Sequence, residues 1–245
     1  MSILSRPAAR AALAVAASAI VAAPAAAQTV YYGQSNLGTQ NAAITQARSD
    51  FLAALTAGVG TETFEGIPDN TRAPVALNFP GAGTATLTGS GSVETSPSSG
   101  AGPVSGAHYY LVTTGGASSA FSIAFANPIA AFGFYGRDLG DNFSNLILRF
   151  TLAAGGTRDV QVPYDASRTA LPNGNLLFFG LIDTASPFTR VEFRSTASGD
   201  VFGFDDMTIG TTQQVASVVP EPSTYVLLAS GLGVLGLVAR RRRTA

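Results

Sequence analysis

Short runs in which apolar and polar residues alternate dominate the chain from Thr61 onward. The alternation is clearest in Phe188–Arg194. Val191 and Phe193 are expected to face one side of the strand, and the alternating charged residues Arg190, Glu192 and Arg194 the other. Successive side chains of a strand point to opposite faces of its sheet, so this pattern predicts β-strands with one buried face. The predicted strands are Thr61–Glu65, Thr84–Thr88, Ser92–Thr95, Tyr109–Thr113, Phe121–Ala126, Ala130–Tyr135, Leu146–Leu152, Arg158–Val162, Leu176–Ile182, Phe188–Arg194 and Val201–Ile209.

Glycine, proline, serine and asparagine separate these strands, and this punctuation predicts an all-β fold. We expect an antiparallel β-sandwich with jelly-roll-like topology. Gly89-Ser90-Gly91 lies between two of the strands and predicts a hairpin that joins Thr84–Thr88 to Ser92–Thr95. No period of about 20 to 50 residues repeats, which argues against a solenoid or propeller.

One segment has helical spacing instead. Asn41–Ala57 predicts a helix whose start Thr39 or Asn41 caps and whose end Gly58 marks. The apolar residues that share one face of this helix are Ile44, Ala47, Phe51, Ala54 and Leu55. The preceding Tyr31–Gln40 is polar with two glycines, and we expect a loop or an edge strand there.

The first 27 residues have the pattern of a secretory signal peptide. Arg6 and Arg10 precede the apolar Ala11–Ala23, and Ala25-Ala26-Ala27 supplies small residues for cleavage before Gln28. An uncleaved N-terminal anchor is the alternative. Export through the Sec translocon follows from the signal-peptide interpretation.

Residues 220–245 have a second topogenic pattern. Pro220-Glu221-Pro222 is followed by Tyr225–Ala239, 15 uncharged residues, and then by Arg240, Arg241, Arg242 and Arg243. As a helix this run reaches about 22 Å, and the arginines can extend it toward the roughly 30 Å of a bilayer core. The arginine cluster favours a cytoplasmic location for its own end. The pattern therefore predicts a transmembrane helix, and an ordinary C-terminal anchor is one interpretation of it.

The order of these parts resembles the PEP-CTERM sorting signal of Gram-negative bacteria. The resemblance implies that a membrane-embedded exosortase recognises Pro220, Glu221 and Pro222, and that the protein is associated with exopolysaccharide. We expect a membrane-anchored intermediate and then a protein of the envelope surface or extracellular matrix. The expected organisation is a signal peptide (1–27), an N-terminal segment with a helix (28–60), a β-sandwich domain (61–212), a linker (213–219) and the sorting signal (220–245).

Composition narrows the functions of the exported part. The chain has no cysteine and no lysine, which excludes a disulfide framework and the lysine of a phosphate-binding loop. Without the terminal segments, 8 arginines face 14 acidic residues, a formal net charge of −6. Such an acidic domain is a poor partner for nucleic acid.

Two short motifs at opposite ends of the domain resemble the ends of calcium-binding jelly-roll and galactose-binding-like modules. They are Phe64-Glu65-Gly66 and Phe204-Asp205-Asp206-Met207. The resemblance implies a structural calcium ion held by Glu65 together with Asp206, or with Asp205 as the alternative ligand. The chain departs from such modules in having no tryptophan, the usual platform for a sugar ring.

Catalytic patterns are sparse. His108 is the single histidine, no Gly-x-Ser-x-Gly motif is present, and we predict no catalytic residue. Asp138 and Asp141 form a carboxylate pair in a polar turn, which leaves a glycoside-hydrolase-like enzyme as an alternative. The aromatic residues considered for stacking on a sugar are Tyr109, Tyr110, Tyr135 and Tyr164.

From the sequence we therefore expect a non-enzymatic exported protein of the cell surface or matrix. A glycan-binding module is the first alternative, and a secreted hydrolase is the second.

Overall fold

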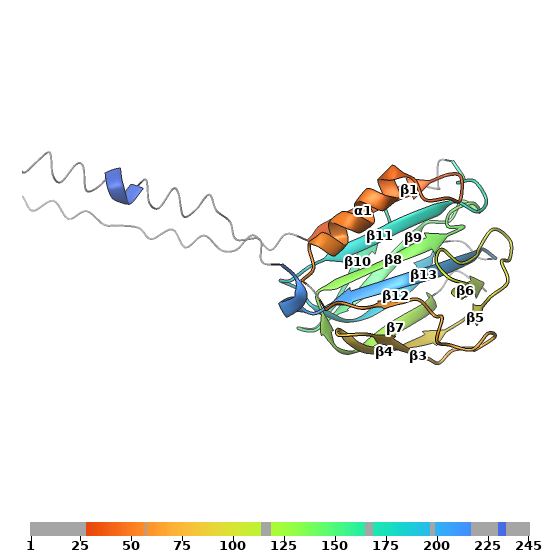
Figure 1. The fold of residues 1–245 in the computed structure, drawn as a ribbon, viewed down its shortest axis with the longest axis horizontal. Coiled ribbons are helices and arrows are strands. Elements are labelled where there is room, and N and C mark those ends of the chain that lie inside the picture. Colours follow the sequence, from red (N-terminus) through yellow and green to blue (C-terminus); the bar gives the residue numbers. More distant parts are fainter. Residues whose placement is uncertain are drawn as a thin grey trace, which may run out of the picture.

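The computed structural model describes the chain in six stretches, and their fold is a sandwich of two antiparallel β-sheets with one helix on an outer face (Figure 1). The described residues are 28–56, 58–113, 119–164, 169–196, 199–216 and 230–233. The predicted signal peptide, most of the predicted transmembrane helix, Pro220–Pro222 and Arg240–Arg243 lie outside them. Within the described part, no helix is both long and apolar enough to cross a membrane.

In the described residues, the first sheet has seven strands. Their order is β1 (Thr29–Ser35), β11 (Leu176–Ile182), β8 (Ala131–Arg137), β13 (Val201–Gly210), β6 (Tyr109–Thr113) and β5 (Ser92–Glu94), with β2 (Thr61–Glu62) paired to β13. The second sheet has six, in the order β10 (Thr157–Gln161), β9 (Leu146–Leu152), β12 (Phe188–Ser195), β7 (Ser119–Ile129), β4 (Gly83–Gly89) and β3 (Val75–Phe79).

Phenylalanine dominates the core between the sheets. The ring of Phe193 on β12 stacks on Phe121 of β7 at a centroid distance of 4.1 Å, and it meets Phe134 and Phe204 of the opposite sheet edge-on at 5.3 and 4.9 Å. These rings are fully buried. The predicted orientation of Val191 and Phe193 is therefore confirmed, and the two-sheet sandwich with it.

A second, smaller core lies between the first sheet and helix α1 (Ala42–Ala53). Ile44 and Phe51 are fully buried there against Phe178 and neighbouring residues of the sheet. The predicted cap is confirmed, because the Asn41 side chain accepts the Ile44 N–H at 3.0 Å. The helix ends earlier than predicted. Beyond it, the Thr56 N–H donates to the Gln214 carbonyl at 2.7 Å, which draws the chain toward the short 3-10 helix η1 (Thr212–Gln214).

The predicted hairpin around Gly89-Ser90-Gly91 is wrong. Strand β4 pairs with β3 and β7 in one sheet, whereas β5 pairs with β6 in the other. Gly89 and Gly91 both have positive φ, and they carry the chain from one sheet to the other. Strand β3 was not predicted, and the predicted strand Thr61–Glu65 ends at Glu62.

The described domain begins and ends at the same end of the first sheet. Thr29 pairs with Ile182, Ile182 with Ala131, and Ala131 with Gly210, so the start of β1 and the end of β13 lie in one row. The end of β8 and the starts of β11 and β13 lie at the opposite end of this sheet, because Arg137 pairs with both Leu176 and Gly203. Figure 1 shows these strands running between the two ends of the sandwich.

Candidate functional site

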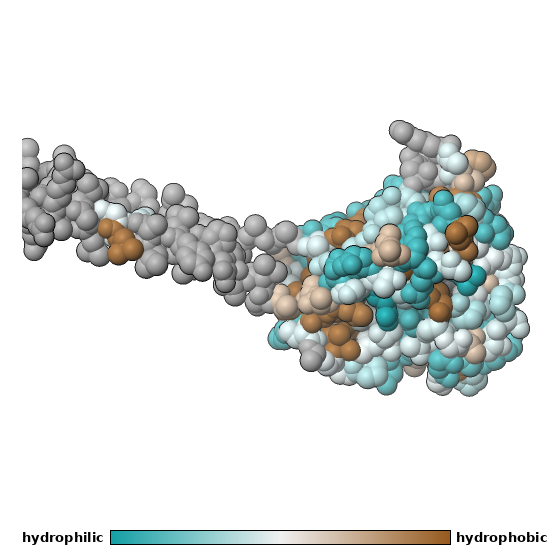
Figure 2. Space-filling model, turned by 45° about the horizontal axis from the view of Figure 1, so that its top comes forward, coloured by the Kyte–Doolittle hydropathy of each residue, from teal (hydrophilic) through white to brown (hydrophobic). Residues whose placement is uncertain are grey.

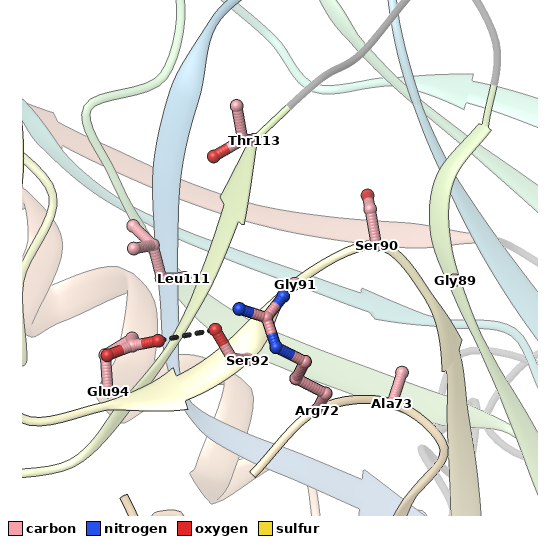
Figure 3. A pocket seen from close by; sticks show the side chains of 9 residues that line it. All are labelled: Arg72, Ala73, Gly89, Ser90, Gly91, Ser92, Glu94, Leu111 and Thr113. Atoms are coloured by element: carbon pink, nitrogen blue, oxygen red, sulfur yellow. Dashed lines mark hydrogen bonds between the residues drawn. The ribbon is translucent and has the colours of Figure 1, made fainter. Parts of the chain in front are cut away.

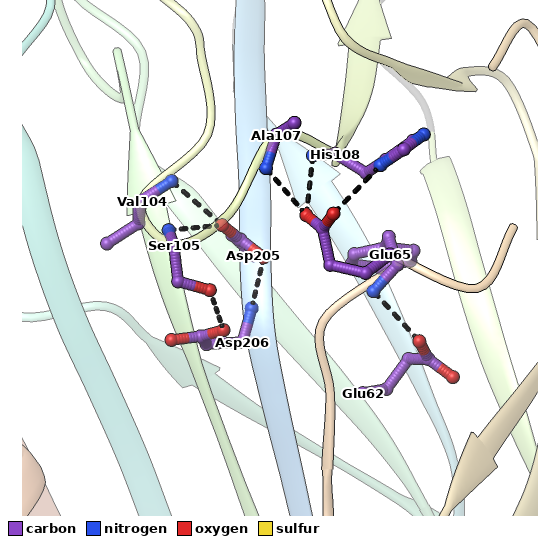
Figure 4. Close-up of polar contacts among 9 residues, drawn as sticks. Glu62, Glu65, Val104, Ser105, Ala107, His108, Asp205 and Asp206 are labelled. Atoms are coloured by element: carbon purple, nitrogen blue, oxygen red, sulfur yellow. Dashed lines mark hydrogen bonds and ion pairs between the residues drawn. The ribbon is translucent and has the colours of Figure 1, made fainter.

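Glu65 holds a loop against the domain. It follows β2, and its Oε1 accepts the backbone N–H groups of Ala107 and His108, each at 2.7 Å (Figure 4). Its Oε2 lies 3.1 Å from Nδ1 of His108. These contacts, the His108 N–H above all, lower the pKa of the Glu65 carboxyl. His108 is thus a partner of Glu65.

Asp205 is buried in β13 at 1 % exposure and binds the same loop. Its Oδ2 accepts the N–H groups of Val104 and Ser105 at 2.8 and 2.9 Å, and its Oδ1 accepts the N–H of Asp206 at 2.7 Å. Burial nevertheless raises the pKa of Asp205 to about 7. Three backbone donors thus stabilise a carboxylate that its apolar surroundings disfavour.

The Asp206 side chain contacts the same loop as that of Asp205, and the register of β13 shifts between Asp205 and Thr208. It has a φ of +48°, which a residue with a side chain adopts rarely. Its Oδ1 accepts the Ser105 hydroxyl at 2.6 Å, and its Oδ2 lies 3.7 Å from the Arg48 guanidinium of α1. In a regular strand the two aspartates would point to opposite faces, so the irregularity brings both to the loop.

The structure therefore places the three predicted calcium ligands around one loop, residues 104–108, as Figure 4 shows. The backbone N–H groups of this loop supply the positive partial charges that a cation would otherwise supply. Within the described residues, no group of three acidic, histidine or cysteine side chains could hold a metal ion. Calcium binding by Glu65, Asp205 and Asp206 stays a prediction.

Glu62 belongs to the same region and was missed. It is 9 % exposed, and its two carboxylate oxygens accept the N–H groups of Phe64 and Asn78, each at 2.8 Å. It thereby ties β2 to β3. The sequence signal that could have identified Glu62 is an acidic residue within a predicted strand. A carboxylate that faces the interior of a sandwich needs buried hydrogen-bond donors.

A polar pocket of about 510 Å³ opens beside β5 and β6 (Figure 3). Its lining consists of Arg72, Ala73, Gly89, Ser90, Gly91, Ser92, Glu94, Leu111 and Thr113. The Ser92 hydroxyl donates to Glu94 Oε1 at 2.5 Å. Arg72 lies opposite this pair, and no described residue forms an ion pair with its exposed guanidinium. The pocket thus offers a cation, a carboxylate and hydroxyl groups.

The four tyrosines considered for sugar stacking do not present their rings to solvent. Tyr109 and Tyr110 are 0 % exposed, Tyr135 is 2 % and Tyr164 is 4 % exposed. The Tyr109 and Tyr110 hydroxyls donate to the carbonyls of Ser96 and Ser90 at 2.9 and 3.0 Å. These rings are core residues, and no aromatic ring lines the pocket.

Asp138 is inaccessible as well, at 1 % exposure. It accepts the Gly174 N–H, and its burial raises the pKa of its carboxyl to about 6. A raised pKa suits a general acid, but a substrate cannot reach this group unless the segments around Gly100 and Gly174, which lie against its carboxyl, move. Asp141 lies nearby at the end of that turn, and its charge contributes to the shift.

Few large hydrophobic side chains are exposed among the described residues of the domain. On the face shown in Figure 2, hydrophobic patches of limited size lie within a surface of hydrophilic and neutral residues. The exposed large hydrophobic residues of the domain are Val30, Leu37 and Phe143. Isolated apolar residues of this kind are ordinary on protein surfaces.

Comparison with solved structures finds carbohydrate-binding modules. The xylan-binding domain from CBM22, formally x6b domain, is 17% identical with a TM-score of 0.39 over 65% of this chain and 99% of that chain. The CBM22-1 xylan-binding domain from Paenibacillus barcinonensis Xyn10C is 13% identical, with a TM-score of 0.40 over 67% and 100%. TmCBM61 in complex with β-1,4-galactotriose is 15% identical, with a TM-score of 0.29 over 61% and 94%. Scores this low do not establish a common ligand or function.

No curated protein matches the chain. The family model of the PEP-CTERM protein-sorting motif matches residues 218–243. The match includes Pro220-Glu221-Pro222, the apolar run and all four terminal arginines. The chain therefore carries a PEP-CTERM protein-sorting motif directly after its folded domain.

Proposed function

We propose that this is a non-enzymatic exported protein that an exosortase sorts to the cell surface or extracellular matrix. The observation that carries the proposal is the sorting motif at residues 218–243, with Pro220-Glu221-Pro222 at its start. The Sec translocon exports the chain by means of the signal peptide, residues 1–27. Tyr225–Ala239 then holds an intermediate in the membrane until the exosortase acts.

The geometry of the domain supports display in this way. The described domain ends at Ala216, two residues before the motif begins, and β1 starts at the same end of the sheet. The start of the mature chain and the connection to the sorting motif therefore lie at one end. The turn after Arg137 and the pocket beside Thr113 then face away from the membrane, because Arg137 and Thr113 lie toward the other ends of their strands.

The surroundings of Asp138 and His108 support a non-enzymatic role. Asp138 is buried, and the His108 side chain, which is 20 % exposed, is paired with Glu65. Neither lies in the pocket that Arg72 and Glu94 line. A secreted hydrolase would need a reactive group that a substrate can approach.

The exosortase proposal is tested in a host that has the enzyme. Replacing Pro220, Glu221 and Pro222 together by alanine removes the proposed recognition sequence and leaves the apolar run intact. We expect an uncleaved form that stays in the membrane fraction. Gln213→Ala, an exposed residue upstream of the motif, is the matched control and should be processed normally. Normal processing of the triple variant would contradict the proposal.

Glycan binding is the second candidate function, and the pocket is the observation that favours it. Arg72 together with Glu94 and Ser92 can hydrogen-bond the hydroxyl or carboxylate groups of a saccharide. Such a site would associate the protein with exopolysaccharide through polar contacts, without a stacking ring.

Pull-down of the purified protein with acidic and neutral polysaccharides tests this second function. We expect Arg72→Ala and Glu94→Gln to weaken retention, while Arg149→Ala, on the far sheet, leaves it unchanged. Equal retention of the three variants would exclude the pocket as the binding site.

A further inference from the structure

A pair of acidic residues joins the turn that follows β8 to the start of β13, apart from the sites described above. Asp141 belongs to this turn, and Asp200 immediately precedes β13. Asp200 is 4 % exposed, and its carboxyl group is within hydrogen-bonding reach of the Asp141 carboxyl. Ser144 donates its hydroxyl to Asp200 Oδ2 at 2.6 Å, and the Val201 N–H donates to Oδ1 at 3.0 Å. Two carboxyl groups in contact repel each other when both are ionised.

The Tyr164 hydroxyl provides an independent observation at the same place. Tyr164 is 4 % exposed, and its buried hydroxyl has no hydrogen bond of acceptable geometry. The Leu146 N–H lies near enough to oppose the rise in the hydroxyl pKa, but the phenolic proton has no acceptor. Burial is the main cause of the raised Tyr164 pKa, and the charges of Asp200 and Asp141 add to it, so both carboxyl groups lie in the neighbourhood of the hydroxyl.

The turn itself packs on this tyrosine. A side chain at Gly140 would meet Tyr164 Cε2 at 2.7 Å and the Ser144 carbonyl oxygen at 3.2 Å. One carboxylate oxygen of Asp141 is also buried without a hydrogen-bond partner. One oxygen of Asp141 and the Tyr164 hydroxyl are therefore buried without partners in the region where Gly140 packs on Tyr164 and Ser144 binds Asp200. Buried polar atoms without partners are rare, and an ion is one reason for them.

We propose that Asp141 and Asp200, together with the hydroxyls of Ser144 and Tyr164, form a binding site for a calcium ion. All four groups offer oxygen, which suits a hard cation, and no nitrogen or sulfur ligand is among them. Calcium accepts irregular arrangements of six to eight oxygens, so backbone carbonyls or water would complete the shell. The ion neutralises the carboxylate pair and fixes the turn after β8 to the start of β13.

This site differs from the one predicted around Glu65. Asp205 and Glu65 already accept backbone N–H groups with oxygens that face the 104–108 loop, whereas Asp141 has an unsatisfied buried oxygen. Variants of Asp141 and of Glu65 can therefore show which of the two sites binds calcium.

The first test is thermal unfolding of the purified full chain, with excess calcium and with chelator. A ligand that binds only the folded state raises the midpoint. We expect calcium to raise the wild-type midpoint, Asp141→Asn and Asp200→Asn to abolish the rise, and Glu65→Ala to retain it. Asp141→Asn keeps the side-chain shape and removes one charge of the pair, so its midpoint in chelator should equal or exceed that of the wild type. Failure of calcium to move the wild-type midpoint, or a full response in Asp141→Asn, would overturn the proposal.

Terbium gives a second test that does not depend on stability. Terbium replaces calcium in oxygen-rich sites and emits when a nearby excited tyrosine transfers energy to it, and the chain has no tryptophan to compete. We expect sensitised emission from the wild type that calcium displaces, and a large loss of emission in Tyr164→Phe. Tyr110→Phe, at the Glu65 end of the domain, should keep the emission. Emission that depends on Tyr110 and not on Tyr164 would place the ion elsewhere.

Discussion

Asp205 shows how far a single residue can depart from its behaviour in water. Its carboxyl is almost completely buried, yet three backbone N–H groups donate to it. Burial is the larger influence and raises its pKa to about 7 from the ordinary 3.8. Asp138 and Asp200 are shifted in the same direction, each to about 6, again mainly by burial. These residues couple the stability of the domain to pH.

The raised pKa values of these three carboxyl groups determine how stability changes with pH. At a pH between the ordinary and the raised pKa, the groups bind more protons in the folded state than in the unfolded state. The free energy of unfolding therefore falls as pH rises through this window. Glu65 and Asp159 have lowered pKa values, and their opposing effect lies below about pH 4.5.

We therefore predict a lower thermal midpoint at pH 7.5 than at pH 5, measured in chelator so that bound cations do not contribute. Asp205→Asn should reduce the difference between the two midpoints because the most strongly shifted of the three groups no longer titrates. The same variant should destabilise the domain by about 1–3 kcal/mol, since its NH₂ group faces a backbone N–H and leaves a donor unpaired. A midpoint that rises from pH 5 to pH 7.5, or an unchanged difference in Asp205→Asn, would refute this prediction.

At the scale of elements, helix α1 depends on two glycines in the sheet beneath it. Added Cβ atoms at Gly133 and Gly180 would lie 2.8 and 2.6 Å from the ring of Phe51. Phe51 is fully buried and also packs against Phe178 at a centroid distance of 5.7 Å. The absence of two side chains thus creates the place where the helix docks.

Gly180→Ala should therefore destabilise the protein by about 1–3 kcal/mol, because the methyl group displaces the Phe51 ring. Gly66→Ala is the matched control, since a Cβ there meets no atom within 4 Å. Denaturant unfolding of both variants measures the effect. Equal midpoints for the two would show that α1 docks without this close approach.

Element by element, the sequence predicted strands well where one face alone is buried. Val191 and Phe193 alternate with charged neighbours on β12, and helical spacing identified Ile44 and Phe51. The wrong predictions concern which strands pair with each other. Gly89 and Gly91 predicted a hairpin turn, because the local spacing of residues carries no information about which sheet the next strand joins.

The candidate sites were predictable only in part, for a related reason. Glu65, Asp205 and Asp206 were selected from short motifs, and the structure brings them to one loop. The backbone N–H groups that donate to Glu65 and to Asp205 Oδ2 lie about 40 and 100 residues away in sequence, and such donors leave no pattern in side-chain identity. The Asp141–Asp200 pair was not foreseen, because the register of β13 and the turn after β8 had to be known first.

At the scale of the whole molecule, the domain and the sorting motif have separate tasks. The sandwich has its own core, and its first strand begins and its last strand ends in one row. Under the proposed sorting, a ligand of the domain would bind at the opposite end or on the sides. The proposed calcium site and the pocket both lie toward that opposite end, since Asp200 and Thr113 flank the start of β13.

The most direct measurement of the central claim is the C-terminal mass of the wild-type protein from a host that has an exosortase. Intact-mass spectrometry of the surface and matrix fractions locates the last residue without any variant. Because the motif begins with Pro220-Glu221-Pro222 outside the apolar run, we predict a mature chain that ends near this tripeptide and lacks Arg240–Arg243. A mature protein that is intact to Ala245 would contradict sorting by an exosortase.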